Sequence, residues 1–211
     1  MKKLLVLSTL LAAPAFATPY IGAEYGVAAT NHNFEPVVNF VQLTPDNNEG
    51  VAGVFMGYQF SDNLALELGY RQSELSDGQG QESLVGTGAD LTEIEKDWDA
   101  DIKVKQLTLM PIYSFHINDK WTAKLGAGIS YSRYDFSASF TETSEHVATD
   151  IETVTSHITG DTGTHSEIGA IASVGVEYAI MPEWTVGVNA KYQADSFANS
   201  SSVSLMTRYS F

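Results

Sequence analysis

The 211-residue sequence contains no cysteine, which excludes a disulfide framework and any thiol chemistry. It is also poor in positive charge, with 11 Lys and Arg residues against 26 Asp and Glu residues and a formal net charge of −15. A chain of this sign repels the phosphate backbone of nucleic acids, so we exclude a nucleic-acid partner. Beyond residue 17 the sequence has no apolar run that could cross a bilayer as a helix.

The first residues have the pattern of a secretory signal peptide. Two lysines precede a short apolar run over 4–13, and Ala15-Phe16-Ala17 fits a small-x-small cleavage site. The run is too short for a membrane helix, so we predict export and cleavage after Ala17. Residues 1–17 therefore stand apart from residues 18–211, which are long enough for one domain.

The last stretch of the sequence predicts a β-strand with one apolar and one polar face. Its alternate residues are Val203, Leu205, Thr207, Tyr209 and Phe211 on one side and Ser204, Met206, Arg208 and Ser210 on the other. The aromatic pair Tyr209 and Phe211 resembles the closing strand of bacterial outer-membrane barrels. In those proteins this pair is the membrane-insertion signal that the barrel-insertion machinery reads, which implies the same partner here.

The same two-residue period recurs in earlier segments of the sequence. With the last stretch, the predicted strands cover 19–28, 51–60, 64–73, 102–115, 120–134, 167–180, 184–193 and 203–211. Short turns alternate with outer loops, which we place at 29–49, 74–101, 135–165 and 194–202. The strands have about the length that a tilted strand needs to cross a bilayer, roughly nine to eleven residues. The sequence therefore predicts an all-β, eight-stranded antiparallel up-and-down barrel.

An eight-stranded barrel would also fit a soluble lipocalin-like cup whose apolar face lies inside. Three features favour a transmembrane barrel instead. The polar face is mostly Gly, Ser, Thr and Ala, which fit the narrow interior of eight strands. Aromatic residues gather near both ends of the strands, as membrane interfaces select, and long and short connections fall at opposite ends. We therefore predict a monomeric barrel in the lipid of the outer membrane.

With the polar face inside, a set of charged residues would lie within the barrel. The set comprises Glu24, Glu67, Arg71, Lys124, Glu177, Lys191 and Arg208. The acids and bases are nearly balanced, and an unpaired charge in a low-dielectric interior costs on the order of several kcal/mol. We interpret the set as a paired plug rather than a proton or ion path, because eight strands leave little open lumen.

Four short motifs resemble those of a known class of proteins. They are Ser114 to Trp121, Lys124 to Gly128, Val174 to Tyr178 and the Tyr209-Ser210-Phe211 end. These motifs are similar to small outer-membrane barrels of the OmpX and OmpA-transmembrane type, and they imply architecture more than function. Size, export signal and acidic loops are also similar to the Vibrio accessory colonization factor A group. That second resemblance implies a role in host colonisation, with no catalytic residues.

The segment over 74–101 is rich in carboxylates. Asp97, Asp99 and Asp101 have the alternate spacing that opens a calcium-binding loop. The match then fails, because Ile102 stands where glycine is required and Thr108 where the last glutamate belongs. We therefore favour a solvated acidic loop, without metal or cofactor, over a loose divalent-cation site at the three aspartates.

The segment over 135–165 has a different character. Residues 136–141 alternate in polarity, and Ile151 to Ile158 is rich in the strand formers Thr, Val and Ile. We predict a hairpin that extends beyond the membrane and turns near Ala148-Thr149-Asp150, rather than a flexible Ser/Thr loop. Its exposed edges would suit pairing with a strand of a host-surface protein.

Catalysis by such a barrel would need a histidine with Ser, Asp or Glu at the outer rim. The best candidate is His165-Ser166-Glu167, although adjacent strand residues point to opposite faces, so His165 and Ser166 would not meet. We therefore predict a non-enzymatic surface protein that acts in adhesion and host colonisation. A structural protein without a specific partner, a carrier of small apolar molecules and a lipid A-modifying enzyme are the alternatives.

Overall fold

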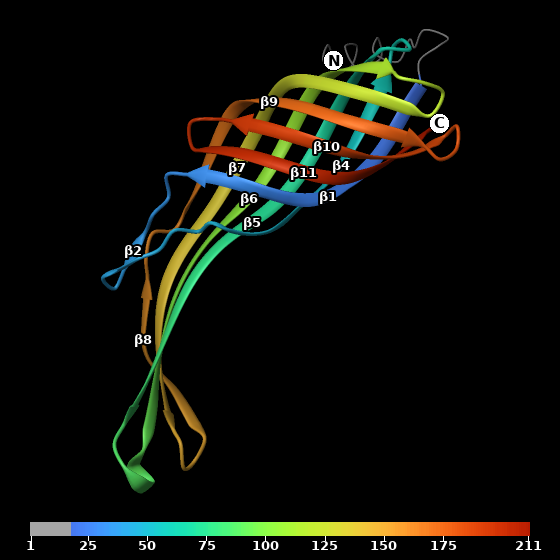
Figure 1. The fold of residues 1–211 in the computed structure, drawn as a ribbon. Coiled ribbons are helices and arrows are strands. Elements are labelled where there is room, and N and C mark those ends of the chain that lie inside the picture. The colour runs from blue at the N-terminus through green and yellow to red at the C-terminus, as the bar shows by residue number, and fades with distance from the viewer. Residues whose placement is uncertain (1–17) are drawn as a thin grey trace, which may run out of the picture.

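The structure, a computed structural model, describes residues 18–211, so the predicted signal peptide at 1–17 lies outside the described residues. The described part is almost entirely β-structure (Figure 1). Its strands are β1 (Thr18–His32), β2 (Val37–Val38), β3 (Val41–Gln42), β4 (Asn47–Gln59), β5 (Leu64–Val85), β6 (Thr92–His116), β7 (Trp121–His146), β8 (Ile151–Thr159), β9 (Gly163–Ala179), β10 (Trp184–Ala194) and β11 (Ala198–Ser210), and a short 3-10 helix, η2, covers Gly88–Asp90. No helix in the described range is long and apolar enough to cross a membrane.

Eight of the strands described by the structure close into a ring. Going round it, β1, β4, β5, β6, β7, β9, β10 and β11 pair antiparallel with their neighbours, and β11 returns to β1. The closing ladder runs from Tyr20 opposite Ser210 to His32 opposite Ala198. The predicted eight-stranded antiparallel up-and-down barrel is confirmed.

The faces of the barrel wall have the polarity of a membrane protein. On β11, Ser204 is buried while its neighbours Val203 and Leu205 are 52% and 70% exposed. The interior is tight, since a Cβ added at Gly57 would lie 2.0 Å from the ring of Tyr20. Apolar side chains outside and polar side chains inside are the reverse of a lipocalin-like cup, so that alternative is wrong.

The segment 74–101 is where our prediction of a loop is wrong. Strands β5 and β6 pair without interruption from Leu64 opposite Tyr113 to Val85 opposite Thr92, so the connection is only 86–91. Glycine and aspartate disfavour strands on average, which made the composition look like a loop. Burial of Trp98 and Ile102 on one face overrides that preference.

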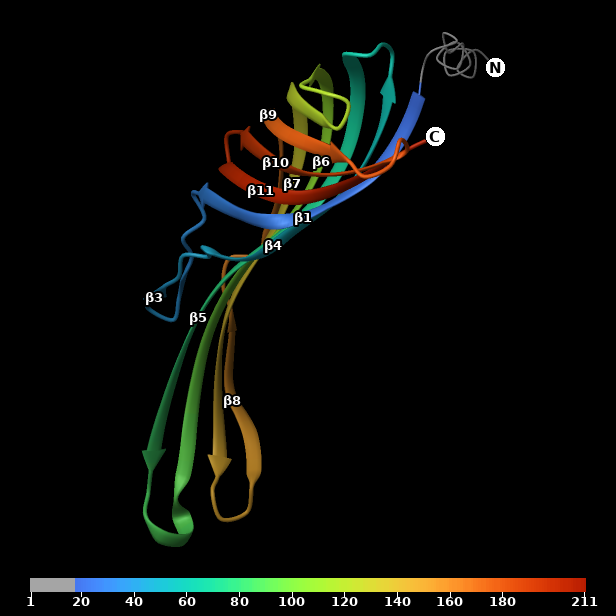
Figure 2. The ribbon, with the colours of Figure 1, turned by 45° about the vertical axis from the view of Figure 1, so that its right-hand side comes forward.

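The predicted hairpin beyond strand β7 is confirmed. Strand β8 pairs with the outer part of β7, from Ser139 opposite Thr159 to His146 opposite Ile151. The turn lies over 147–150 and has a positive φ of 57° at Asp150, which aspartate tolerates better than most residues. The outer parts of β5, β6, β7 and β8, over 77–100 and 137–159, thus form one four-stranded sheet that we call the ribbon. It projects well beyond the barrel (Figures 1 and 2).

The other two outer loops also contain more β-structure than predicted. Within 29–49, β1 continues to His32, the small hairpin β2–β3 follows, and β4 begins at Asn47. Within 194–202, the connection between β10 and β11 shrinks to 195–197. Its turn is held by Asp195, whose Oδ1 accepts hydrogen bonds from the backbone N–H groups of Phe197 and Ala198 at 2.9 and 2.8 Å.

The described residues bury apolar side chains in two places. One core lies inside the barrel around Tyr20, Phe55 and Met110. The other lies where the ribbon leaves the barrel. There the segment 33–46 covers the inner face of the strands with Phe34, Val38 and Leu43, which pack against Leu75, Trp98, Ala100, Ile102, Ala138 and Phe140. The ribbon is therefore anchored at its base by a core that is separate from the one inside the barrel and that Ile102, Tyr134 and Ala198 of the barrel strands also help to form.

Candidate functional sites in the barrel interior and on the ribbon

The first interior cluster is centred on Glu24 of β1. Lys191 on β10 donates from Nζ to both carboxylate oxygens of Glu24, at 2.7 and 2.8 Å. Arg71 on β5 forms an ion pair with the same carboxylate, with Nε 3.4 Å from Oε1, and donates from Nη2 to Ser202 Oγ at 2.7 Å. One buried carboxylate thus joins three strands across the barrel.

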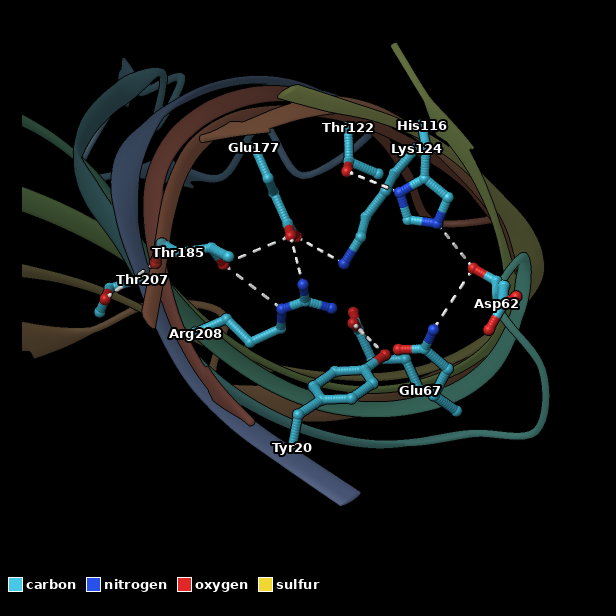
Figure 3. A network of polar contacts seen from close by, with 11 residues as sticks. Tyr20, Asp62, Glu67, His116, Thr122, Lys124, Glu177, Thr185, Thr207 and Arg208 are labelled. Carbon is cyan, nitrogen blue, oxygen red and sulfur yellow. Dashed lines mark hydrogen bonds and ion pairs between the residues drawn. The ribbon is translucent and has the colours of Figure 1, made fainter. Parts of the chain in front are cut away.

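The second interior cluster is centred on Glu177 of β9 (Figure 3). Lys124 Nζ lies 2.5 Å from Glu177 Oε1, and Arg208 Nη2 lies 2.8 Å from Oε2. Thr185 Oγ1 also donates to Oε2 at 3.3 Å. This carboxylate therefore joins β7, β10 and β11, and its side chain is only 2% exposed.

Tyr20 connects Glu67 to the second cluster. Its hydroxyl donates to Glu67 Oε2 at 3.1 Å, and the Arg208 guanidinium lies 5.1 Å from the centre of its ring (Figure 3). The structure thus places the charged residues chosen from the sequence inside the barrel, in two clusters. Sequence reasoning missed Tyr20, although the two-residue period that places Glu24 inside also places Tyr20 there.

Little free volume remains beside these charges. A cavity of about 20 Å³ lies against Glu67, Lys124 and Glu177, and another of about 30 Å³ lies against Arg71 and Tyr134. Each has room for only one or two water molecules. The arrangement can hold the wall strands together through buried ion pairs, and both cavities are far smaller than an open pore needs.

The outer face of the ribbon carries carboxylates directly opposite one another. Glu82 pairs across strands with Glu95, and Glu93 on β6 lies opposite Glu145 on β7. Glu145 in turn lies opposite Glu152 on β8. Like charges in such pairs are destabilising, so this surface has a charge distribution that folding alone does not favour.

Two of these carboxyls have pKa values above the ordinary value for glutamate. The charge of Asp97 is the main cause that raises the pKa of Glu95. A hydrogen bond with Asp150 is the main cause that raises the pKa of Glu145. Protonation at lower pH therefore relieves repulsion at the outer end of the ribbon.

The three aspartates chosen as a loose metal site lie in a row on β6. Asp97, Asp99 and Asp101 face the same side, and Gly78 stands opposite Asp99 on β5. In a strand, alternate residues are about 6.6 Å apart, whereas the ligands of a calcium loop converge on one point. Over residues 18–211, with the side chains of 47–49 and 89 left aside, no group of three or more acidic, His or Cys residues could hold a metal ion.

The histidine chosen as the best catalytic candidate lies at the outer mouth of the barrel. His165 Nε2 is 2.6 Å from Glu167 Oε1, and its ring stacks on Phe197 with 5.4 Å between ring centres. Ser166 lies on the opposite face of β9, across from Arg133. The structure therefore brings His165 to Glu167 but not to Ser166.

The aromatic residues of the predicted insertion signal lie at the end of the barrel away from the ribbon. The rings of Tyr209 and Phe211 are 5.1 Å apart, and Tyr209 also contacts Trp184 with 5.9 Å between centres. Phe211 N–H donates to the carbonyl of Pro19 at 3.1 Å. A role for the pair in membrane insertion stays a prediction.

A closed eight-stranded wall, apolar outside and filled with paired charges, defines a small transmembrane β-barrel of the bacterial outer membrane. The chain belongs to the family of the OmpA-like transmembrane domain, whose model matches residues 14–203. The predicted resemblance to OmpX and OmpA-type barrels and the outer-membrane location are confirmed. No curated protein sequence matches the chain.

Two solved structures illustrate the similarity of fold. Neisserial surface protein A has a TM-score of 0.58 and 15% identity, over 92% of this chain and 99% of that chain. Ail, the attachment invasion locus protein of Yersinia pestis, was crystallised with the heparin analogue sucrose octasulfate and has a TM-score of 0.53. It shares 15% identity over 92% of this chain and 99% of that chain. The likeness to the Vibrio accessory colonization factor A group stays a prediction.

Proposed function

We propose that the protein is a non-enzymatic surface protein that attaches the bacterium to a host-surface protein through the ribbon. The observation that carries this proposal is the pair of open strand edges beyond the barrel. Residues 77–85 of β5 pair only with β6, and β8 pairs only with β7 among the described residues. Such edges present rows of backbone donors and acceptors that a strand of a partner can extend.

The charge of the ribbon indicates the chemistry of the partner. Its outer face carries Glu82, Glu93, Glu95, Glu145 and Glu152, and the side chain of Lys96 is paired with Glu142 at 3.3 Å. Electrostatic complementarity therefore favours a basic host-surface segment. Ail was crystallised with a polyanion. The negative charge of the ribbon would repel such a ligand, so the partner that we propose here carries positive charge.

The experiment that tests the proposal removes the ribbon and keeps its anchored base. Residues 80–97 and 141–157 are each replaced by a short Gly/Asn turn. Gln79 then joins Trp98, and Phe140 joins Ile158; both pairs face each other across the existing ladders. Surface level and heat-modifiable gel mobility are matched, and bacteria that adhere to epithelial monolayers are counted.

We expect adherence of the full protein to exceed that of an empty vector and to fall to the vector level after truncation. A matched variant with Gln substituted for Glu82, Glu93 and Glu95 separates the contribution of charge to adherence from that of the strand edges. Partial loss in that variant would assign part of the binding to charge, and full adherence would assign it to the strand edges. Equal adherence of full and truncated proteins would overturn the proposal and favour the structural alternative.

A further inference from the structure

The few basic residues of this acidic chain are not scattered. Four of those in the described range lie inside the barrel, namely Arg71, Lys124, Lys191 and Arg208. Of the remaining five, Lys96 lies in the ribbon and Lys120 in a turn at the opposite end of the barrel. The other three, Lys103, Lys105 and Arg133, lie together on neighbouring strands β6 and β7. We call these three residues the basic patch.

The basic patch lies next to the lipid-facing surface. On the outer face of the wall, Leu107 lies opposite Tyr70 on one neighbouring strand and Tyr131 on the other, and all three side chains are exposed. The two tyrosines belong to the aromatic residues near the ribbon end of the barrel. The next row outward places Lys105 opposite Arg133, and the row after that places Lys103 opposite Asp135. Aromatic residues of this kind mark the interface of the hydrocarbon with the headgroups, so the patch is at headgroup level.

The contacts within the patch leave its positive groups accessible. Asp135 lies between two cations, with Oδ1 3.0 Å from Arg133 Nε and Oδ2 3.6 Å from Lys105 Nζ. Glu74 Oε1 lies 3.4 Å from Lys103 Nζ. The side chains of the three cations are about half exposed, at 54% for Lys103, 45% for Lys105 and 53% for Arg133. An ammonium or guanidinium with one such contact keeps further donors for an anion.

One further feature points to an anionic ligand at this level. The three cations share only two carboxylates, Asp135 and Glu74, so the patch keeps an excess of positive charge. An anion that approaches Lys105 and Arg133 from the adjoining aromatic row would balance that excess.

We propose that the basic patch binds the phosphate groups of anionic lipid headgroups in the outer leaflet. The order of charges along β6 favours lipid over a soluble polyanion. Beyond the patch, Asp101, Asp99 and Asp97 follow at every second residue on the same face. A polyanion that approached from water would pass this acidic row, whereas a lipid phosphate reaches the patch from the membrane. From Lys103 to Asp101 the charge changes from basic to acidic within one two-residue step, about 7 Å. This change would also fix the depth at which the barrel sits in the membrane.

This proposal is independent of the attachment function and is tested on the full mature chain. The patch variant carries Lys103→Gln, Lys105→Gln and Arg133→Gln, and the matched control carries Lys96→Gln and Lys120→Gln. Both are purified in neutral detergent, checked for heat-modifiable mobility and titrated with diphosphorylated lipid A, and bound lipid is counted by native mass spectrometry. A conservative variant with Lys103→Arg and Lys105→Arg, which keeps the positive charge, is measured as well and serves as the test if the patch variant does not fold.

We expect lipid A binding to weaken at least about tenfold in the patch variant and to stay unchanged in the control and the conservative variant. Dephosphorylated lipid A should bind the unmodified protein as weakly as diphosphorylated lipid A binds the patch variant. Equal binding of both lipids, or equal loss in the control, would overturn the proposal. Displacement of lipid A by millimolar inorganic phosphate would overturn the lipid as the source of the anion. If the patch variant does not fold, weaker binding by the conservative variant would also overturn the proposal.

Discussion

The barrel and the ribbon share strands β5, β6 and β7, but their carboxylates have opposite surroundings: cations in the barrel and other carboxylates on the ribbon. Inside the barrel, Glu177 contacts Lys124 and Arg208 and is almost fully buried. On the ribbon, Glu93 lies opposite Glu145, which lies opposite Glu152. Interior charges thus hold the wall together, whereas the ribbon keeps charges that oppose its own folding. Charges that destabilise the free protein are typical of binding surfaces, where a partner of opposite charge neutralises them.

The largest effect should follow from breaking an interior ion pair. Glu24→Gln leaves Lys191 and Arg71 buried without their carboxylate, which should lower the free energy of unfolding by about 3–5 kcal/mol. Urea titration of the purified barrel in lipid vesicles measures this. Glu95→Gln on the ribbon is the matched control and should leave barrel unfolding unchanged. Equal effects of the two variants would remove the contrast between the regions.

A smaller, local effect should follow from opening the base of the ribbon. Trp98 is buried and packs against Phe140 with 4.9 Å between ring centres, so Trp98→Ala should destabilise this core by about 3 kcal/mol. Hydrogen exchange should then speed up in 33–46 and in the ribbon, with the barrel strands unaffected. Ile151→Ala, at an exposed site near the tip, should change neither. Faster exchange throughout the barrel would contradict a separate core.

A still smaller effect should appear as a pH dependence confined to the ribbon. Because the pKa values of Glu95 and Glu145 are raised in the folded state, the ribbon binds more protons when folded and gains stability as pH falls through those values. Asp135 behaves oppositely: hydrogen bonds from Thr164 and Arg133 lower its pKa, so its stabilising contribution is present above the ordinary pKa of aspartate and is lost only as pH falls through the lowered value.

Amide exchange measured at about pH 5 and about pH 7, corrected for intrinsic rates, checks this sign. Exchange in 82–95 and 143–153 should be slower at the lower pH, and exchange around Asp135 should not change. The difference should vanish in a variant with Gln at Glu93, Glu95 and Glu145. Slower exchange at the higher pH would contradict the assigned repulsion.

The smallest expected signal concerns conduction through the barrel. The interior clusters and the small cavities beside them predict negligible single-channel conductance in planar bilayers. Removal of the ribbon should not change that result. Steady and reproducible currents from the full or truncated protein would show that the interior charges line an ion path.

The parts of the molecule that follow a local period were predictable from the sequence. Two-residue alternation places Glu24 and Glu177 inside and Leu205 outside. Alternation over 136–141, together with the strand-forming residues over 151–158, also predicted the hairpin. Which charges pair depends on register between strands far apart in sequence, as for Glu24 and Lys191, and no local pattern carries that information. The same holds for the packing of Phe34 on the ribbon, which stabilises strands whose composition resembles a loop.

The central claim is that the barrel is a self-sufficient scaffold and that the ribbon is an addition, anchored by a second core at the outer end of the barrel. The most direct test heats the full protein and the variant lacking 80–97 and 141–157, and records the temperature at which the heat-modifiable gel mobility is lost. The account predicts the same transition temperature for both, because every interior ion pair centred on Glu24 and Glu177 is retained. A clearly lower temperature for the truncated protein would show that the barrel depends on the ribbon and would contradict the account.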